Sequence, residues 1–307
     1  MITAYITHPA CLKHEMFTEH PECPSRLSVI EDHLKARGLF DFMHHFTAPK
    51  VTITQLERAH TSKHIRRLME QSPAEDIAYL DADTAMNPFS LEAAFCAAGA
   101  GVLAVEKIMA GDVNNAFCNV RPPGHHAERE ASMGFCFFNN IAVAALHAIE
   151  KYALKRVAVV DFDVHHGNGS EDILQHNPHV LYFSTFQHPF YPHSNTPEAE
   201  NMINIPLSEG VGSSEYRYAF TQKLLPRLEA YQPDMLFISA GFDAHYEDDM
   251  AGLNLVDSDY LWITRALMEI ANKTAQGRVV SMLEGGYALE ALGRSATEHV
   301  RVLMGMD

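Results

Sequence analysis

Short apolar runs alternate with longer amphipathic stretches along the chain, and this pattern predicts strands and helices in alternation. Continuous apolar runs such as residues 157–160 are typical of strands that are buried on both faces. We expect strands at residues 4–6, 115–117, 157–160, 180–184, 235–239 and 279–283, and helices at 24–37, 90–109, 139–152, 214–231, 257–273 and 288–303. The alternation predicts one α/β domain over residues 1–307, an open, mainly parallel sheet with helices on both faces.

Composition and charge narrow the classes of protein that fit this pattern. Of the 307 residues, 47% are hydrophobic and 20% are charged, which is typical of a globular protein and not of a disordered one. The net charge of -16 gives no basic face, so we expect no nucleic-acid partner. An acidic surface attracts cationic partners, but the same charge also serves solubility alone.

Cysteine usage and the N-terminus bear on the compartment. The five cysteines are odd in number and form no C-x-x-C pair, which argues against a disulfide framework and against a thiolate zinc site. No basic segment followed by a long apolar run is present, nor any stretch of about 18 apolar residues. We therefore expect a cytoplasmic protein with no membrane partner; the oligomeric state stays open.

Ligand-type side chains follow the apolar run at residues 157–160. Alternation along an extended segment puts Asp161, Asp163 and His165 on the same side. Buried carboxylates need pairing or a metal, so this string favours a metal site over a hydrogen-bonded core cluster. Asp243 follows the run 235–239 and adds another carboxylate; a set of two aspartates and one histidine leaves a position open for water, as in catalytic zinc sites. The two carboxylates keep Fe²⁺ as an alternative metal.

Two further motifs gain meaning beside this cluster. The tandem histidines His125 and His126 follow a stiff Pro-Pro-Gly turn, and they suit metal binding, acid–base chemistry or simple packing. Tyr287 follows two glycines at the mouth of the run 279–283. Its hydroxyl suits stabilisation of a developing oxyanion, and packing of the ring in a turn is the alternative.

Two other patterns resemble known motifs but lack essential parts. His60 and His64 have the spacing of a metalloprotease helix, but no glutamate follows the first histidine. The glycines at residues 99–101 lie inside a helical pattern and do not follow a strand, as a dinucleotide-binding motif requires. We expect both to be structural.

Taken in order, several segments resemble the motifs of the histone deacetylase superfamily, from about residue 20 to the C-terminus. These segments are residues 121–127, 134–140, 161–170, 239–243 and 284–287. Asn168 resembles the class II branch and its bacterial relatives, the deacetylase-like amidohydrolases, because class I members carry aspartate there. The resemblance implies the arginase–deacetylase fold and a bacterial cytoplasmic enzyme.

The resemblance also implies roles for individual residues. The implied zinc ligands are Asp163, His165 and Asp243. The implied catalytic residues are His125, His126, Asp161, Asn168 and Tyr287, with Asp161 orienting His125 and Asn168 contacting His126. The implied substrate-binding residues are Gly134, Phe135, Tyr191 and Met250, and Arg26 resembles an arginine of an internal exit channel for acetate.

Bound potassium is implied as well. One site would involve Asp161, Asp163, His165, Ser184 and Thr185, mostly through backbone carbonyls. A second would lie around Leu174, Asn177, Val180 and Asn201.

The implied reaction is hydrolysis of N6-acetyl-lysine in a protein or peptide. Polyamine-selective members carry an acidic residue where Met250 stands, so the apolar residue favours acyl-lysine, although Glu247, Asp248 and Asp249 stand close by. His193 and Asn195 depart from the glycine-rich loop that the family commonly has at the rim.

Three alternatives remain. A deacetylase for acetylpolyamines or other small acetylated amines would share all of the chemistry. A binuclear manganese ureohydrolase would need more bridging carboxylates than the motifs supply. A non-catalytic acyl-lysine binder would have no use for Tyr287 as an oxyanion donor.

Overall fold

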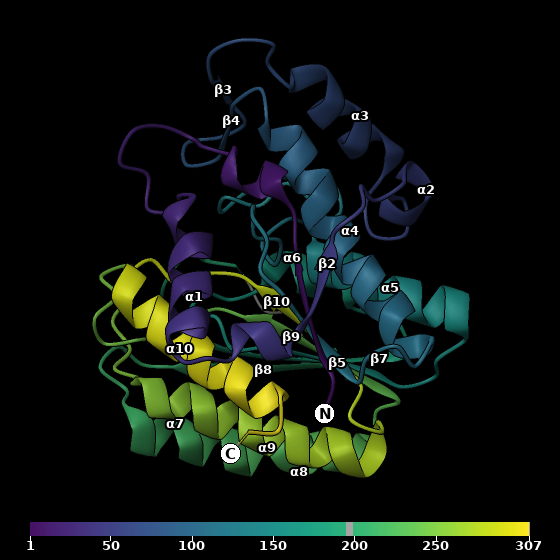
Figure 1. The fold of residues 1–307 in the computed structure, drawn as a ribbon, viewed down its shortest axis with the longest axis vertical. Helices are drawn as coiled ribbons and strands as arrows, with labels where there is room; N and C mark the ends of the chain where they lie inside the picture. The colour runs from purple at the N-terminus through teal and green to yellow at the C-terminus, as the bar shows by residue number, and fades with distance from the viewer. Residues whose placement is uncertain (195–198, 307) are drawn as a thin grey trace.

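Eight parallel strands form one open sheet in the order β2-β1-β5-β10-β9-β6-β7-β8 (Figure 1). The structure is a computed structural model that describes residues 1–194 and 199–306. The strands of the sheet are β1 (Thr3–Thr7), β2 (His44–Thr47), β5 (Asn115–Cys118), β6 (Val157–Asp161), β7 (Val180–Gln187), β8 (Met202–Leu207), β9 (Met235–Ala240) and β10 (Val279–Leu283). A separate hairpin pairs β3 (Ala78–Tyr79) with β4 (Ala85–Met86).

The six strands expected from apolar runs are all present, and the predicted fold class is confirmed. Two strands of this sheet were missed, and both lie at its edges; the two-residue hairpin strands β3 and β4 were missed as well. In β2, three of four residues are exposed; in β8, only three of six residues are buried, and the strand contains Pro206. Edge strands pack on fewer neighbours, so their sequences lack the continuous apolar run that marks a central strand.

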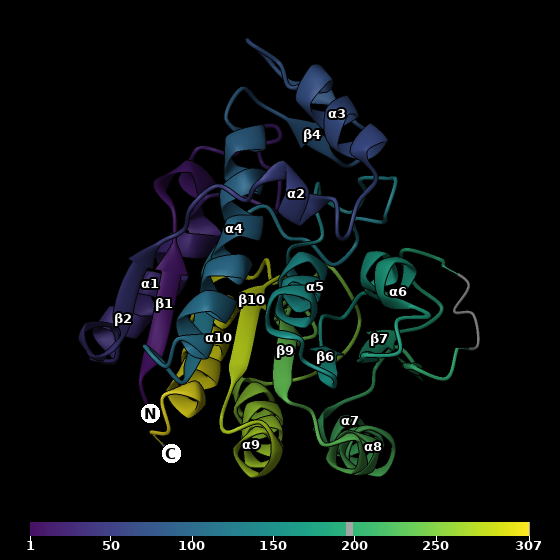
Figure 2. The same ribbon diagram turned by 90° about the vertical axis from the view of Figure 1, so that its right-hand side faces the viewer.

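Helices cover both faces of the sheet (Figure 2). On one face, α1 (Ser25–Ala36), α10 (Leu289–Leu303) and α9 (Asp257–Thr274) pack side by side, and α7 (Ser213–Ala219) and α8 (Leu225–Tyr231) lie against α9. On the other face, α4 (Ser90–Met109) packs on α5 (Asn140–Tyr152), which contacts α6 (Asn168–Leu174). The short helices α2 (Ile53–Leu56) and α3 (Ser62–Gln71) precede the β3–β4 hairpin in the chain. Across the described ranges, none of the helices combines the length and hydropathy needed to cross a bilayer.

The single helix expected at residues 214–231 is interrupted. A π-helical turn, Phe220–Leu224, separates α7 from α8. Pro226 lies in the first turn of α8 and has no backbone N–H to donate to the preceding turn. A locally widened turn accommodates the missing hydrogen bond, a feature that hydrophobic periodicity does not reveal.

A buried carboxylate joins α1 to the segment after β5. Glu22 lies between two arginines: Arg121 Nη2 is 2.7 Å from Oε2, and Arg26 Nη1 is 3.0 Å from Oε1. All three side chains are fully buried. Burial would raise the pKa of Glu22, but Arg121 and His14 outweigh it and hold the pKa well below 4.5. Glu22 is therefore the carboxylate that pairs directly with both arginines.

We predict that Glu22→Gln strongly destabilises the fold, because removing one partner leaves buried charges without compensation. The free energy of unfolding should fall by about 3–5 kcal/mol at neutral pH. The matched control is Glu229→Gln, which breaks an exposed pair with Lys273 and should cost about 1 kcal/mol or less.

Urea titration of both variants measures the difference. Because the folded pKa of Glu22 is depressed, the contribution of Glu22 is present above the ordinary value of 4.5 and is lost as the pH falls toward the folded value. Equal stabilities of the two variants at pH 7 would contradict the prediction.

Candidate active site

Polar segments follow four adjacent central strands, β5, β10, β9 and β6. The carboxyl ends of parallel strands meet at one edge of the sheet, which is where ligands bind in folds of this kind. The segments at this edge contain His125 and His126 after β5, Asp163 and His165 after β6, Asp243 after β9 and Tyr287 after β10.

Asp163, His165 and Asp243 form a compact buried cluster. One potential ligand atom from each lies within 4.8 Å of the other two. His165 Nδ1 is 3.1 Å from Asp163 Oδ1 and 3.2 Å from Asp243 Oδ2. Burial would lower the pKa of His165, but the two carboxylates outweigh it and raise the pKa to about 10. The two carboxylates therefore favour positive charge at this position.

The surroundings of this cluster fit a divalent cation. Asp243 Oδ2 is buried and accepts no well-aligned hydrogen bond among the described residues, although His165 Nδ1 lies 3.2 Å away. A Cβ on Gly285 would lie 2.0 Å from that oxygen, and a Cβ on Gly241 would lie 2.0 Å from Asp163 Oδ2. The backbone thus leaves space for the carboxylates only because both positions are glycine. Two carboxylates and one imidazole are a donor set that suits Zn²⁺ or Fe²⁺.

The tandem histidines have different partners and opposite pKa shifts. His125 Nδ1 lies 3.0 Å from Asp161 Oδ2. Burial would lower the pKa of His125, but Asp161 and Asp163 outweigh it and hold the pKa well above 6.5. Burial lowers the pKa of His126 well below 6.5, and the neighbouring His125 and His165 lower it further. At neutral pH the first histidine is therefore a cation and the second is neutral.

Asn168 determines which nitrogen of His126 carries the proton. Asn168 Nδ2 donates to Glu128 Oε1 at 2.8 Å, so Asn168 Oδ1 faces His126 Nδ1, also at 2.8 Å. An amide oxygen only accepts, so Nδ1 of the neutral ring is the donor. His126 Nε2 is thereby left with a free lone pair.

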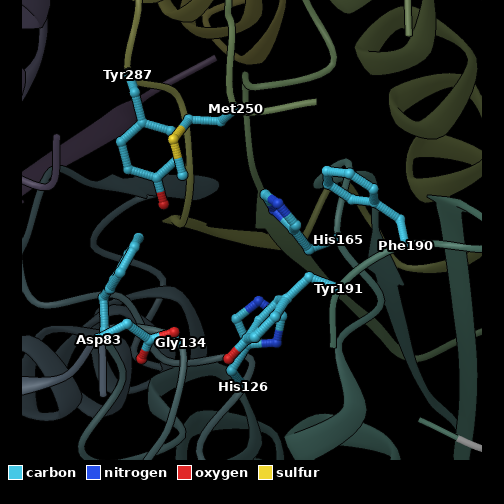
Figure 3. Close-up of a pocket in the computed structure, with 9 residues that line it drawn as sticks. Asp83, His126, Gly134, His165, Phe190, Tyr191, Met250 and Tyr287 are labelled. Carbon is cyan, nitrogen blue, oxygen red and sulfur yellow. The ribbon is translucent and has the colours of Figure 1, made fainter. Parts of the chain in front are cut away.

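A cavity of about 230 Å³ opens at this cluster (Figure 3). Its lining residues are Asp83, His126, Gly134, Phe135, His165, Phe190, Tyr191, Met250 and Tyr287. All four residues expected to bind substrate are in this set. Phe190 and Asp83 were missed. Phe190 stacks on His165 with 5.7 Å between ring centroids, and only its place beside Tyr191 hinted at it. No sequence signal marked Asp83, which lies between the hairpin strands β3 and β4.

Tyr287 projects its hydroxyl into the cavity (Figure 3). Burial raises the pKa of Tyr287 well above 10, outweighing the opposite effect of Arg26, so the hydroxyl stays protonated. The Arg26 guanidinium lies 4.9 Å from the centre of the tyrosine ring. Arg26 Nε also donates to Gly286 O at 2.6 Å, so Arg26 holds the backbone of the residue that precedes Tyr287.

The residues of the first expected potassium site lie together at the ends of β6 and β7, where Asp161 pairs in register with Ser184. Ser184 Oγ is buried without a hydrogen-bond partner in the described part of the chain. Thr185 Oγ1 lies 3.5 Å from Asp161 O. At the second expected site, Asn201 Nδ2 donates to Leu174 O at 3.1 Å and to Asn177 O at 3.3 Å.

The two incomplete motifs are structural in the fold. His60 precedes α3 and His64 lies within it, and their Nε2 atoms contact backbone atoms of Asn139 and Phe137 at 2.8 and 3.0 Å. The glycines at residues 99–101 lie inside α4. His193 is exposed in the loop after Tyr191, and Asn195 lies outside the described residues.

Comparison with known proteins places this geometry in a family. A model of the histone deacetylase domain matches residues 20–303. An uncharacterized protein of Synechocystis sp. is 37% identical, and the match covers 99% of this chain and 100% of that protein. The polyamine deacetylase HDAC10 of Mus musculus is 34% identical, with 99% of this chain but only 48% of that protein covered, so the chain spans about half of its length.

A solved structure agrees with these matches. The crystal structure of the HDA15 HD domain aligns with a TM-score of 0.93 and 36% sequence identity, covering 99% of this chain and 88% of that one. A family model that matches nearly the whole chain and a shared fold at this identity lead to one conclusion: the chain belongs to the histone deacetylase family.

Proposed function

We propose that this protein is a metal-dependent deacetylase that hydrolyses the amide of N6-acetyl-lysine in proteins or peptides to lysine and acetate. The observation that carries the proposal is the buried cluster of Asp163, His165 and Asp243 beside a narrow cavity, with His126 and Tyr287 on its walls. Residues 1–307 would act as a single deacetylase domain, and we expect a cytoplasmic location.

The metal would be held by Asp163, His165 and Asp243. The buried Asp243 oxygen, which accepts no well-aligned hydrogen bond, and the space left by the two glycines support this assignment. A Zn²⁺ ion there, or Fe²⁺, would polarise the amide carbonyl and lower the pKa of a water molecule from 15.7 to about 7.

His126 is the proposed general base. Its depressed pKa keeps the ring neutral at neutral pH, and the contact with Asn168 leaves Nε2 with a free lone pair that can accept a proton from water. The same nitrogen then delivers the proton to the leaving amine. Asp161, whose Oδ2 lies 3.0 Å from His125 Nδ1, would orient the ring of His125 beside the reacting centre.

Tyr287 is the proposed donor to the oxyanion. Its raised pKa keeps the proton on the hydroxyl, which can donate a hydrogen bond as negative charge develops on the carbonyl oxygen. Arg26 lies under the ring, and we propose that it also lines the route by which acetate leaves.

The cavity walls favour a long aliphatic side chain. Phe135, Phe190 and Tyr191 present aromatic surface, Gly134 leaves room beside them, and Met250 adds apolar surface opposite. Glu247, one of the acidic neighbours of Met250, forms an ion pair with Arg294 at 2.6 Å, so its charge is partly neutralised. These features favour acyl-lysine over a free cationic amine.

A small acetylated amine is the second candidate substrate. The carboxylate of Asp83 lines the same cavity and could bind an ammonium group. A relative that is 34% identical is a polyamine deacetylase.

A potassium ion near Asp161, Asp163, His165, Ser184 and Thr185 is part of the proposal as a structural element. The partnerless Ser184 hydroxyl supports it. A second ion near Leu174, Asn177, Val180 and Asn201 has weaker support, because Asn201 already bonds the Leu174 and Asn177 carbonyls.

The proposed activity requires both a bound metal and an acyl-lysine substrate. Metal-stripped protein should release no acetate from an acetyl-lysine peptide, and one equivalent of Zn²⁺ should restore release. Release from N-acetylputrescine, assayed in parallel, should be slower. Release only from the polyamine would shift the substrate while keeping the mechanism. Folded, zinc-loaded protein that hydrolyses neither compound would contradict the proposed activity.

Tyr287→Phe should fold and bind metal like the parent protein but turn over far more slowly. Loss of one oxyanion donor typically lowers kcat by ~10²–10³-fold. Steady-state kinetics with metal analysis measures this, and Tyr79→Phe, on an exposed ring, is the matched control. A kcat within twofold of the parent value would rule out the role of Tyr287.

Met250→Glu should shift selectivity toward cationic amines, because a carboxylate at the cavity wall attracts an ammonium group. The ratio of kcat/KM for N-acetylputrescine to that for the peptide should rise by roughly fivefold, since one charge pair near a surface is worth about 1 kcal/mol. Competition assays report this ratio directly. An unchanged ratio would show that Met250 does not face the bound substrate.

A further inference from the structure

The loop between β9 and α9 carries three consecutive acidic residues with different environments. Glu247 and Asp249 are exposed, but Asp248 between them is 4% exposed. A buried carboxylate must find hydrogen-bond donors to offset the cost of its desolvation. The partners of Asp248 therefore indicate what this residue does.

Both carboxylate oxygens of Asp248 accept hydrogen bonds from the backbone. Oδ2 accepts from the N–H groups of Tyr287, at 2.6 Å, and Ala288, at 3.0 Å. Oδ1 accepts from the N–H group of Met250 at 3.1 Å. One side chain thus connects two cavity-lining residues that are 37 positions apart in the chain.

The tyrosine segment needs such an anchor. Tyr287 follows two glycines, and Gly286 has a φ of +119°, a conformation that a non-glycine residue rarely adopts. The carbonyl groups of the segment are bonded by Arg26, and the N–H group of Gly285 donates to Asp163 Oδ2 at 2.8 Å. Asp248 supplies the contact at the N–H group of the tyrosine itself.

We propose that Asp248 is a positioning residue that holds the Tyr287 hydroxyl and the Met250 wall in one fixed arrangement. Both side chains line the cavity (Figure 3). The inference rests on the proposed role of Tyr287 as the oxyanion donor. It adds that the position of this donor depends on a carboxylate that does not itself line the cavity.

Asparagine cannot replace Asp248 in this arrangement. An ionised carboxylate has two accepting oxygens, and N–H donors approach both of them. An amide has one accepting oxygen, so its NH₂ group would face either the Met250 N–H or the Tyr287 and Ala288 N–H groups. In both orientations one backbone segment is pushed away. A misplacement of about 1 Å in a catalytic site can lower the rate by about 10²-fold.

Amide hydrogen exchange of the unmodified protein is the first test. The N–H groups of Tyr287 and Ala288 belong to partly exposed residues outside regular structure, yet they should be protected because Asp248 binds them. Asp248→Asn should speed exchange by roughly tenfold at whichever side faces its NH₂ group, either the Met250 amide or the Tyr287 and Ala288 amides, in line with one lost hydrogen bond. The matched control is Asp249→Asn, which removes the neighbouring exposed charge and should change nothing. Rapid exchange of both amides in the unmodified protein would overturn the proposal without any variant.

A double-mutant cycle with Tyr287→Phe tests whether Asp248 acts through the tyrosine. Alone, Asp248→Asn should lower kcat by roughly 10²-fold with metal content unchanged. Added to Tyr287→Phe, it should lower kcat much less, because the hydroxyl that it positions is already absent. Asp248→Ser serves as a second variant if the asparagine variant does not fold.

The outcomes separate this inference from the proposed function. If the fold-loss in kcat of the double variant equals the product of the two single losses, the positioning role is overturned, because Asp248 then acts independently of the tyrosine. A normal kcat for Asp248→Asn, beside a strongly impaired Tyr287→Phe, would also overturn it and leave the proposed function intact. A normal kcat for Tyr287→Phe would remove the role of the tyrosine itself, and with it the basis of the inference.

Discussion

The structure depends on keeping two carboxylates buried side by side at the carboxyl edge of the sheet. Asp163 and Asp243 come from different strands, and burial together with the Asp163 charge raises the pKa of Asp243 to about 6. Backbone N–H groups offset part of this cost: Val164 donates to Asp243 at 2.9 Å, and Gly285 donates to Asp163 at 2.8 Å. What these donors leave uncompensated is the negative potential that suits a divalent cation.

The same potential separates the properties of two adjacent histidines. His125 lies near Asp161 and Asp163 and is held as a cation, whereas His126 is turned toward a neutral amide and stays neutral. The two imidazole rings, whose centroids are 4.0 Å apart, therefore differ: one carries a charge and the other can accept a proton. The difference in pKa comes from the surroundings of each ring and not from the residue type, as is usual for neighbouring groups of the same kind in active sites.

Around this charged centre, the segment that carries Tyr287 is fixed by contacts that lie outside the cavity. Arg26 reaches it from α1 and is itself compensated by the buried Glu22. Asp248 reaches it from the loop after β9. The glycines give the segment the conformation it needs but no stiffness, so rigidity must come from these distant side chains.

The sequence by itself determined the central strands, most helices and the polar residues that follow the strands. These features are local: a buried parallel strand has a continuous apolar run, and the residues that bind ligands follow its carboxyl end. Only the tertiary structure decided the edge strands β2 and β8, the entry of Asp83 and Phe190 into the cavity, and the inward orientation of Asp248 beside two exposed acidic neighbours. Those features depend on donors and surfaces contributed from far along the chain, which no window of the sequence contains.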